Sequence, residues 1–257
     1  MGYFNVTVKP IIPASLQHVG AFGAQDVLFD WVAFDIPKGG ARCIGATLLV
    51  RPKGDANPTK NDFGAWFIVS SSNDVSLGTV NSTSTPRPSN DFIGILEIGN
   101  EHSYVNRLRG TNIGTTGRAT NNETQHPSFV VARNAGSDGN GANVGYDRFY
   151  LGAMSNGAFN FESLNAIAEA GAADAASTQV ITMDGTGMDV REHFIAGDVV
   201  HIGTSAGTPA ADSLIGTVAS ADSATQLTLE AVSPTALVDG DVLYNIHPMR
   251  IILHFEQ

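Results

Sequence analysis

The sequence has little charge, one cysteine and no long apolar run, and each shortage narrows the classes of protein it can belong to. Only 15% of the 257 residues are charged, against about 25% in an average soluble domain. Cys43 has no second cysteine to pair with, and it precedes the apolar run 44–50, so we predict a buried structural thiol. No run approaches the roughly 18 apolar residues of a membrane span. The first residues lack a basic and apolar leader, and we therefore expect a protein made in a cytoplasm that has no membrane partner.

Small and polar residues fill the place of the missing charges. The chain has 28 Gly, 19 Ser, 20 Thr and 18 Asn, which together make a third of it. This composition excludes a helical bundle or coiled coil, because it leaves few strong helix formers. The hydrophobic share of 42% is still enough for a packed core, which argues against a disordered chain.

The few charges are distributed unevenly along the chain. Residues 174–246 contain ten acidic residues and one basic residue, Arg191, whereas the rest of the chain is nearly balanced. This segment therefore carries −9 of the net charge of −11, which suggests that it is a separate unit. Because so acidic a surface repels phosphate backbones, we expect no nucleic-acid partner.

Alternating apolar residues predict strands along most of the chain. Phe4, Val6 and Val8 alternate with polar residues, and turn-forming residues separate the later candidates. Those candidates are 27–32, 44–50, 63–69, 91–98, 128–133, 148–154 and 158–162. Short strands separated by Gly, Pro and Asn turns predict an all-β fold, an antiparallel β-sandwich that is jelly-roll-like.

Three long polar stretches interrupt this pattern, at 70–90, 105–127 and 134–147. Loops of this length are uncommon in compact domains. Two interpretations remain open, namely solvated decoration of the fold and extension across a neighbouring subunit.

The strand pattern restarts after an Ala-rich stretch. Candidates at 180–182, 194–202, 216–220, 226–229 and 237–244 predict a small SH3-like β-barrel. The final segment, 250–257, alternates as clearly as the first strand, and we expect these two ends of the chain to pair. The predicted organisation is a sandwich of residues 1–165 plus 249–257, a linker at 166–178, and an acidic barrel at 179–248 inserted before the last strand.

No motif with recognisable chemistry appears in the sequence. It has no phosphate-binding glycine loop, no helical histidine pair for zinc and no Gly-x-Ser-x-Gly nucleophile turn. Trp31 and Trp66 lie inside predicted strands and are assigned to the core. We therefore predict no catalytic residue, no cofactor and no metal. Candidate assembly contacts are the polar loop residues Arg107, Arg109, Arg118, Asp138 and Asn140.

Several segments resemble virion structural proteins of marine tailed bacteriophages, particularly those that infect cyanobacteria. The resemblance rests on residues 34–42 and 48–55 of the sandwich, 194–198 and 216–218 of the barrel, and 243–255 at the end of the chain. It implies a non-enzymatic, capsid decoration-like role, with the major capsid protein or other virion proteins as partners.

Three alternative functions remain open, the first of which is the one that the resemblance implies. The first is a capsid decoration or cement protein on the exterior of the shell, located in the virion and forming a homo-oligomer. The second is a tail, neck or fibre-associated protein. The third, from another class, is a carbohydrate-binding or carbohydrate-active protein.

Overall fold

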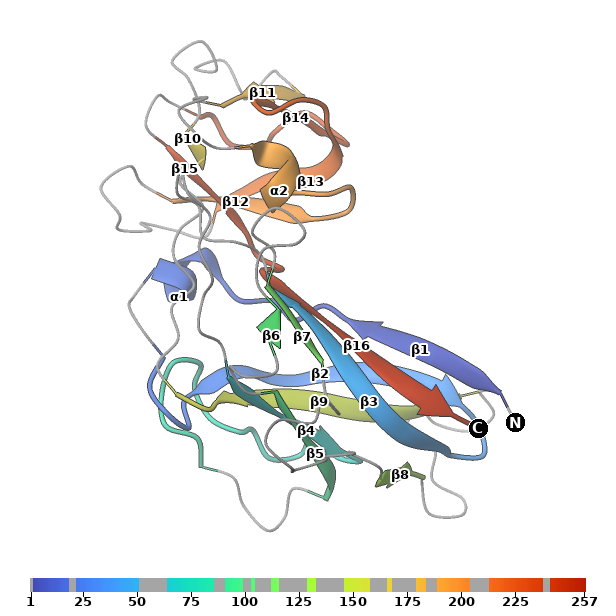
Figure 1. Cartoon of the computed structure of the whole chain (residues 1–257). Helices are drawn as coiled ribbons and strands as arrows, with labels where there is room; N and C mark the ends of the chain where they lie inside the picture. Colours follow the sequence, from blue (N-terminus) through green and yellow to red (C-terminus); the bar gives the residue numbers. More distant parts are fainter. Residues whose placement is uncertain are drawn as a thin grey trace.

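The structure, a computed structural model, describes residues 2–18, 22–50, 64–85, 91–98, 103–104, 112–115, 129–132, 146–157, 166–167, 179–183, 189–203, 213–237 and 241–257. These residues form three antiparallel sheets and two short helices, α1 (Ala14–His18) and α2 (Val190–His193) (Figure 1). The predicted all-β fold is confirmed.

Two of the sheets form a sandwich. The first sheet has the order β1-β16-β3-β7-β6, and β8 also pairs with β3. The second has the order β2-β9-β4-β5. The strands of the first sheet are β1 (Tyr3–Val8), β3 (Ala41–Val50), β6 (Ser103–Tyr104), β7 (Asn112–Thr115), β8 (Phe129–Val131) and β16 (Met249–Glu256). Those of the second are β2 (Val27–Pro37), β4 (Ala65–Ser70), β5 (Phe92–Ile98) and β9 (Tyr146–Ser155).

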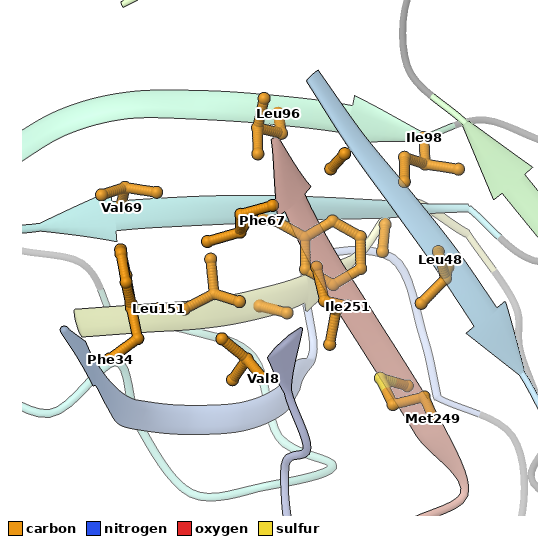
Figure 2. Packing of buried hydrophobic residues seen from close by; sticks show 14 of the residues in the cluster. Val8, Phe34, Leu48, Phe67, Val69, Leu96, Ile98, Leu151, Met249 and Ile251 are labelled. Carbon is orange, nitrogen blue, oxygen red and sulfur yellow. The ribbon is translucent and has the colours of Figure 1, made fainter. Parts of the chain in front are cut away.

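The alternation of apolar residues directs one face of each sheet inward. Strand β16 shows this most clearly, because its residues are buried and half-buried in strict turn. Figure 2 shows side chains from both sheets meeting in one core, with Leu48 and Ile251 from the first sheet and Phe67 and Leu151 from the second. Burial of this shared core holds the two sheets together.

The strand order is that of a jelly roll. The chain passes from β1 in the first sheet to β2 in the second, returns for β3, and crosses again for β4 and β5. It comes back for β6 to β8, crosses for β9, and ends with β16 between β1 and β3. A chain that alternates between two sheets in this order forms a jelly roll, here with six strands in the first sheet and four in the second. The pairing predicted for the two ends of the chain is confirmed, because Tyr3–Val8 runs antiparallel to Met249–Glu256.

A tight corner between β2 and β3 needs two glycines. Gly39 and Gly40 have φ angles of 106° and 77°, which side chains rarely allow. A Cβ on Gly40 would also lie 3.1 Å from the Val131 carbonyl oxygen. These glycines let the chain cross between the sheets within a few residues.

The third sheet lies between β9 and β16 in the sequence, and we call this unit the insert. Its order is β10-β15-β12-β13-β14-β11, and it has its own core, which includes Phe194, Val218 and Leu243. The strands are β10 (Ala166–Ile167), β11 (Val180–Thr182), β12 (Val199–Gly203), β13 (Ser213–Ala221), β14 (Gln226–Leu229) and β15 (Val242–Asn245). The SH3-like shape of the insert stays a prediction.

The structure corrects two assignments made to polar segments. Ala166 and Ile167, assigned to a linker, form β10 on the edge of β15. The stretch 105–127, assigned to a loop, contains β7, which pairs with β3. Both strands are too short to show alternation in the sequence, and both form because a longer neighbour offers its backbone groups. The predicted strand at 158–162 lies outside the described residues.

The described part of the first long polar stretch packs on its own sheet. Residues 71–85 cross the outer face of the second sheet, where Leu77 is fully buried against Val27 and Ile68. The Leu77 amide donates to Asp30 Oδ1 at 2.9 Å, and Trp31 Nε1 donates to the Val75 carbonyl at 2.7 Å. The described residues of this stretch therefore pack on a sheet of their own chain. No helix within the described ranges is long and apolar enough to cross a membrane.

Candidate functional site

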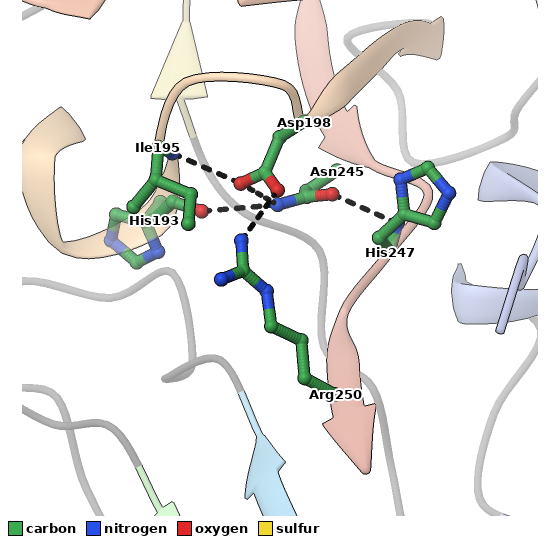
Figure 3. A network of polar contacts seen from close by, with 6 residues as sticks. All are labelled: His193, Ile195, Asp198, Asn245, His247 and Arg250. Carbon is green, nitrogen blue, oxygen red and sulfur yellow. Dashed lines mark hydrogen bonds and ion pairs between the residues drawn. The ribbon is translucent and has the colours of Figure 1, made fainter. Parts of the chain in front are cut away.

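A buried polar network joins the insert to the sandwich, and we call it the junction. It lies where the chain leaves β15 and turns into β16 (Figure 3). Its side chains come from Asp198, Asn245, Arg250 and Gln17, and His247 contributes its backbone amide. These residues belong to separate parts of the chain, and only the folded structure brings them together.

Asp198 is the central acceptor of the junction. A short turn between α2 and β12 places it there, and Gly197 makes that turn possible with a φ of 82°. Asp198 is fully buried. Its Oδ2 accepts from the Ile195 amide at 3.0 Å and from Asn245 Nδ2 at 2.8 Å. Its Oδ1 accepts from an Arg250 terminal nitrogen at 3.2 Å. A buried carboxylate is tolerated because a cation and several donors surround it.

Asn245 connects the insert to the sandwich through its side-chain amide and its backbone carbonyl. Its Nδ2 donates to the His193 carbonyl at 3.2 Å as well as to Asp198, and its Oδ1 accepts from the His247 amide at 2.8 Å. Its backbone carbonyl accepts from Gln17 Nε2 at 2.8 Å. Gln17 belongs to α1, on the sandwich side, and also donates to the Ile12 carbonyl at 2.7 Å.

Two further contacts join the same parts of the molecule. The Ile12 amide donates to the Ile246 carbonyl at 2.9 Å. Ala14 of α1 and Tyr244 of β15 are both fully buried and pack on each other. Apolar packing and hydrogen bonds thus act together to set the position of the insert on the sandwich.

His247 lies half-buried beside Arg250 at the junction. Burial lowers the pKa of His247, since the charged ring loses its hydration; Asp198 opposes this, and Lys9, Arg250 and His201 add to it. The neutral ring is therefore the favoured form around pH 7. A proton on His247 would place a second positive charge near Arg250.

The junction residues hold the insert in position on the sandwich. Its carboxylate and its amide side chains bond to donors and acceptors of the same chain. Among the residues that the structure describes, no group of three or more His, Cys, Asp or Glu is placed to hold a metal ion. Breaking a buried ion pair by removing one partner typically costs about 3–5 kcal/mol. The junction thus acts as a clamp between two separately packed cores.

The predicted assembly contacts are not among these residues. Arg107, Arg109, Arg118, Asp138 and Asn140 all lie outside the described ranges. The prediction for Cys43 is confirmed, because this thiol is fully buried and burial raises its pKa to about 11.

The two tryptophans differ from the prediction. Trp31 and Trp66 do lie in strands, but both are half-buried rather than in the core between the sheets. Trp31 lies under the segment 71–85 and also faces Phe92, with ring centroids 6.2 Å apart. Alternation alone does not distinguish the inner face of a sheet from an outer face that a loop covers.

Sequence reasoning missed the junction. Its sequence signal is slight: a Gly-Asp pair at the start of a strand, and an Asn-Ile-His run before the last strand. Asp198 is 47 residues from Asn245 and 52 from Arg250, and a single sequence does not show which distant residues meet. No protein-family model and no curated protein sequence matches this chain.

Proposed function

We propose that this protein is a non-enzymatic structural component of a bacteriophage particle, a capsid decoration protein that binds the exterior of the shell. The observation that carries the proposal is the jelly-roll strand order, with an insert clamped onto one end of the final strand. Jelly rolls are the architecture of many viral capsid proteins. The step from fold to function is an analogy, and the sequence resemblance to phage virion proteins points the same way.

The distribution of charge suggests how each part of the molecule serves this role. Residues 174–246 carry a net charge of −9, which keeps the insert solvated and makes neighbouring particles repel one another. The sandwich is close to neutral and is the part suited to lie against the shell. In this proposal its partners are the major capsid protein and further copies of itself.

The proposed mechanism is binding free energy repeated by symmetry. Each copy contributes a modest interface, and many copies together stiffen the shell against internal pressure. The junction matters here because a decoration protein transmits force only if its two parts keep a fixed relative position.

The proposal is tested on particles of the phage that encodes the chain. Copy number comes from quantitative mass spectrometry of purified particles. Hundreds of copies per particle support a shell protein, whereas six or twelve indicate the tail or neck alternative. Particles that lack the protein should lose resistance to heat or osmotic shock, and unchanged resistance would refute a cementing role.

One observation favours carbohydrate binding as a second candidate function. Phe92 is 41% exposed and faces Trp31 on the outer face of the second sheet, and lectins also use jelly rolls. Aromatic rings exposed on a sheet suit stacking against a sugar. Titration of the isolated protein with the host's surface glycans tests this, and a Phe92→Ser variant should then lose binding.

A further inference from the structure

We propose that the outer face of the first sheet, at the end that carries both chain termini, binds the same face of a second copy of this chain. This surface consists of Tyr3, Ile44, Arg42, Glu256 and Val130, and we call it the terminal face. The inference rests on the proposed function, in which further copies of the chain are partners, and deepens it by naming the surface through which two copies bind.

Four of these residues form one row across four strands. Tyr3 is the pairing partner of Glu256, Glu256 that of Arg42, and Arg42 that of Val130. Directly opposed residues in antiparallel strands point to the same side of a sheet, with side chains about 5 Å apart. Tyr3 Oη donates to Glu256 Oε1 at 3.4 Å, as this arrangement requires. The row therefore reads apolar, acidic, basic, apolar.

The apolar members of the terminal face are unusually exposed. Tyr3 is 71% exposed, Val130 63% and Ile44 41%. Single exposed apolar residues are normal on protein surfaces, but these three surround one pair of opposite charges. Aromatic, aliphatic and arginine side chains are also the types that anchor the centres of interfaces.

The order of the row makes it complementary to itself. Two copies can pack face to face about a two-fold axis that runs parallel to the strands and lies between Glu256 and Arg42. The row of the second copy then lies over the row of the first in the reverse order. Arg42 then faces Glu256 of the second copy, and Tyr3 faces Val130. A two-fold interface requires this kind of self-complementary patch. An unrelated acidic or basic partner would match only one half of it, which is why we assign the face to a second copy.

The insert leaves the terminal face accessible. Strand β16 begins at the junction with Met249 and reaches the row at Glu256, which is roughly 24 Å further along an extended strand. In Figure 1 both chain ends lie at the tips of β1 and β16, away from the insert. None of the described residues of the insert lies near this end of the sheet.

We expect a weak dimer. A stable interface buries about 800 Å² on each partner and uses 20 to 30 residues. The terminal face is smaller, so we expect a dissociation constant on the order of 10 µM. Such an interface is sparsely occupied in dilute solution and becomes occupied where copies are concentrated.

Charge reversal tests both the interface and the proposed pairing. Sedimentation velocity of the wild-type chain at about 100 µM should show a dimer. R42E and E256R should each raise the dissociation constant about tenfold or more, because like charges then meet across the two-fold axis. An equimolar mixture of the two variants should restore dimers, since an acidic face then meets a basic one. The R42E/E256R double variant should also dimerise.

E230R is the matched control for E256R, since Glu230 is exposed on the insert and the charge change is the same. It should dimerise like the wild type.

If one of the two charge variants fails to fold, Val130→Asp is measured in its place, and it should also weaken the dimer. A wild-type chain that stays monomeric at this concentration would overturn the inference. So would single variants that dimerise normally, or a mixture that stays monomeric. None of these results bears on whether the protein is found on a particle.

Discussion

Asp198 is the residue on which the geometry of the junction depends most. It is fully buried and receives donors from the insert and from β16. An ion pair in such a place is not by itself a source of stability, because both charges lose their hydration. The ion pair instead raises the free energy of any arrangement of insert and sandwich in which Arg250 and Asp198 lie apart, because each charge then lacks its partner.

We predict that Asp198→Asn destabilises the protein by about 3–5 kcal/mol, because Arg250 then keeps a half-buried charge without its counterion. The free energy of unfolding in urea measures this. Asp74→Asn is the control, since Asp74 is exposed, and it should change stability by less than about 0.5 kcal/mol. Equal stability of the two variants would contradict the account of the junction.

Stability should also fall in mild acid through His247 and His254. Burial lowers the pKa of both rings below the ordinary value of 6.5. The unfolded chain therefore takes up these protons first as the pH falls through about 6.5, and the folded state loses stability as the pH falls further. Neutral His254 already bonds through both nitrogens, to Asn5 Oδ1 at 2.8 Å and Thr47 Oγ1 at 2.9 Å.

The measurement is urea unfolding at pH 7.5 and at pH 5.0. The loss between the two should be smaller in H247Q and smallest in the H247Q/H254Q double variant. The comparison between variants removes the contribution of carboxylates, which all of them share. An identical loss in wild type and double variant would show that neither ring titrates as proposed.

Among the elements, β5 and β8 show how the two sheets meet at one edge. Gly94 of β5 lies directly under the ring of Phe129 of β8, so that a Cβ there would be 2.4 Å from the ring. The space for Phe129 therefore exists only because residue 94 has no side chain.

Gly94→Ala should destabilise the protein by about 1–3 kcal/mol through this overlap. The change should be less harmful when Phe129 is also changed to Ala, since the smaller side chain makes room. Gly2→Ala is the control, because a Cβ at Gly2 meets no atom within 4 Å. Thermal unfolding of Gly94→Ala, Phe129→Ala, the double variant and Gly2→Ala measures the coupling, and simple additivity of the two changes would contradict the contact.

Long alternating strands were predictable from the sequence and the covering elements were not. The pattern in 3–8 and 250–257 is set by packing of one face on the core: that face is buried in β16, and in β1 Val8 is buried while Phe4 and Val6 are half-buried against the core. The segment 71–85 was missed because Val75, Leu77 and Val80 are isolated among polar residues, yet each finds an apolar surface or a backbone partner. Its packing depends on the sheet that it covers and not on local pattern.

At the scale of the whole molecule, the insert and the sandwich have separate cores joined by the junction. Such an arrangement predicts that the jelly roll folds without the insert. Because β10 pairs with β15, the piece to remove begins at Ala166 and ends at Ile246.

We expect the chain lacking 166–246, closed by a short Gly-Ser linker, to fold with the spectrum of an antiparallel β protein. It should be less stable than the whole chain, since Gln17 and Arg250 lose partners in the insert. Circular dichroism and a cooperative urea transition measure this. A shortened chain without a cooperative transition would show that the sandwich depends on the insert.

If this protein works by binding in a particle, electron microscopy of intact phage particles should show it in place. We expect density for the jelly roll on the exterior of the shell, repeated with the shell's symmetry, with the acidic insert directed away from the surface. Particles whose shell carries no such density would contradict it.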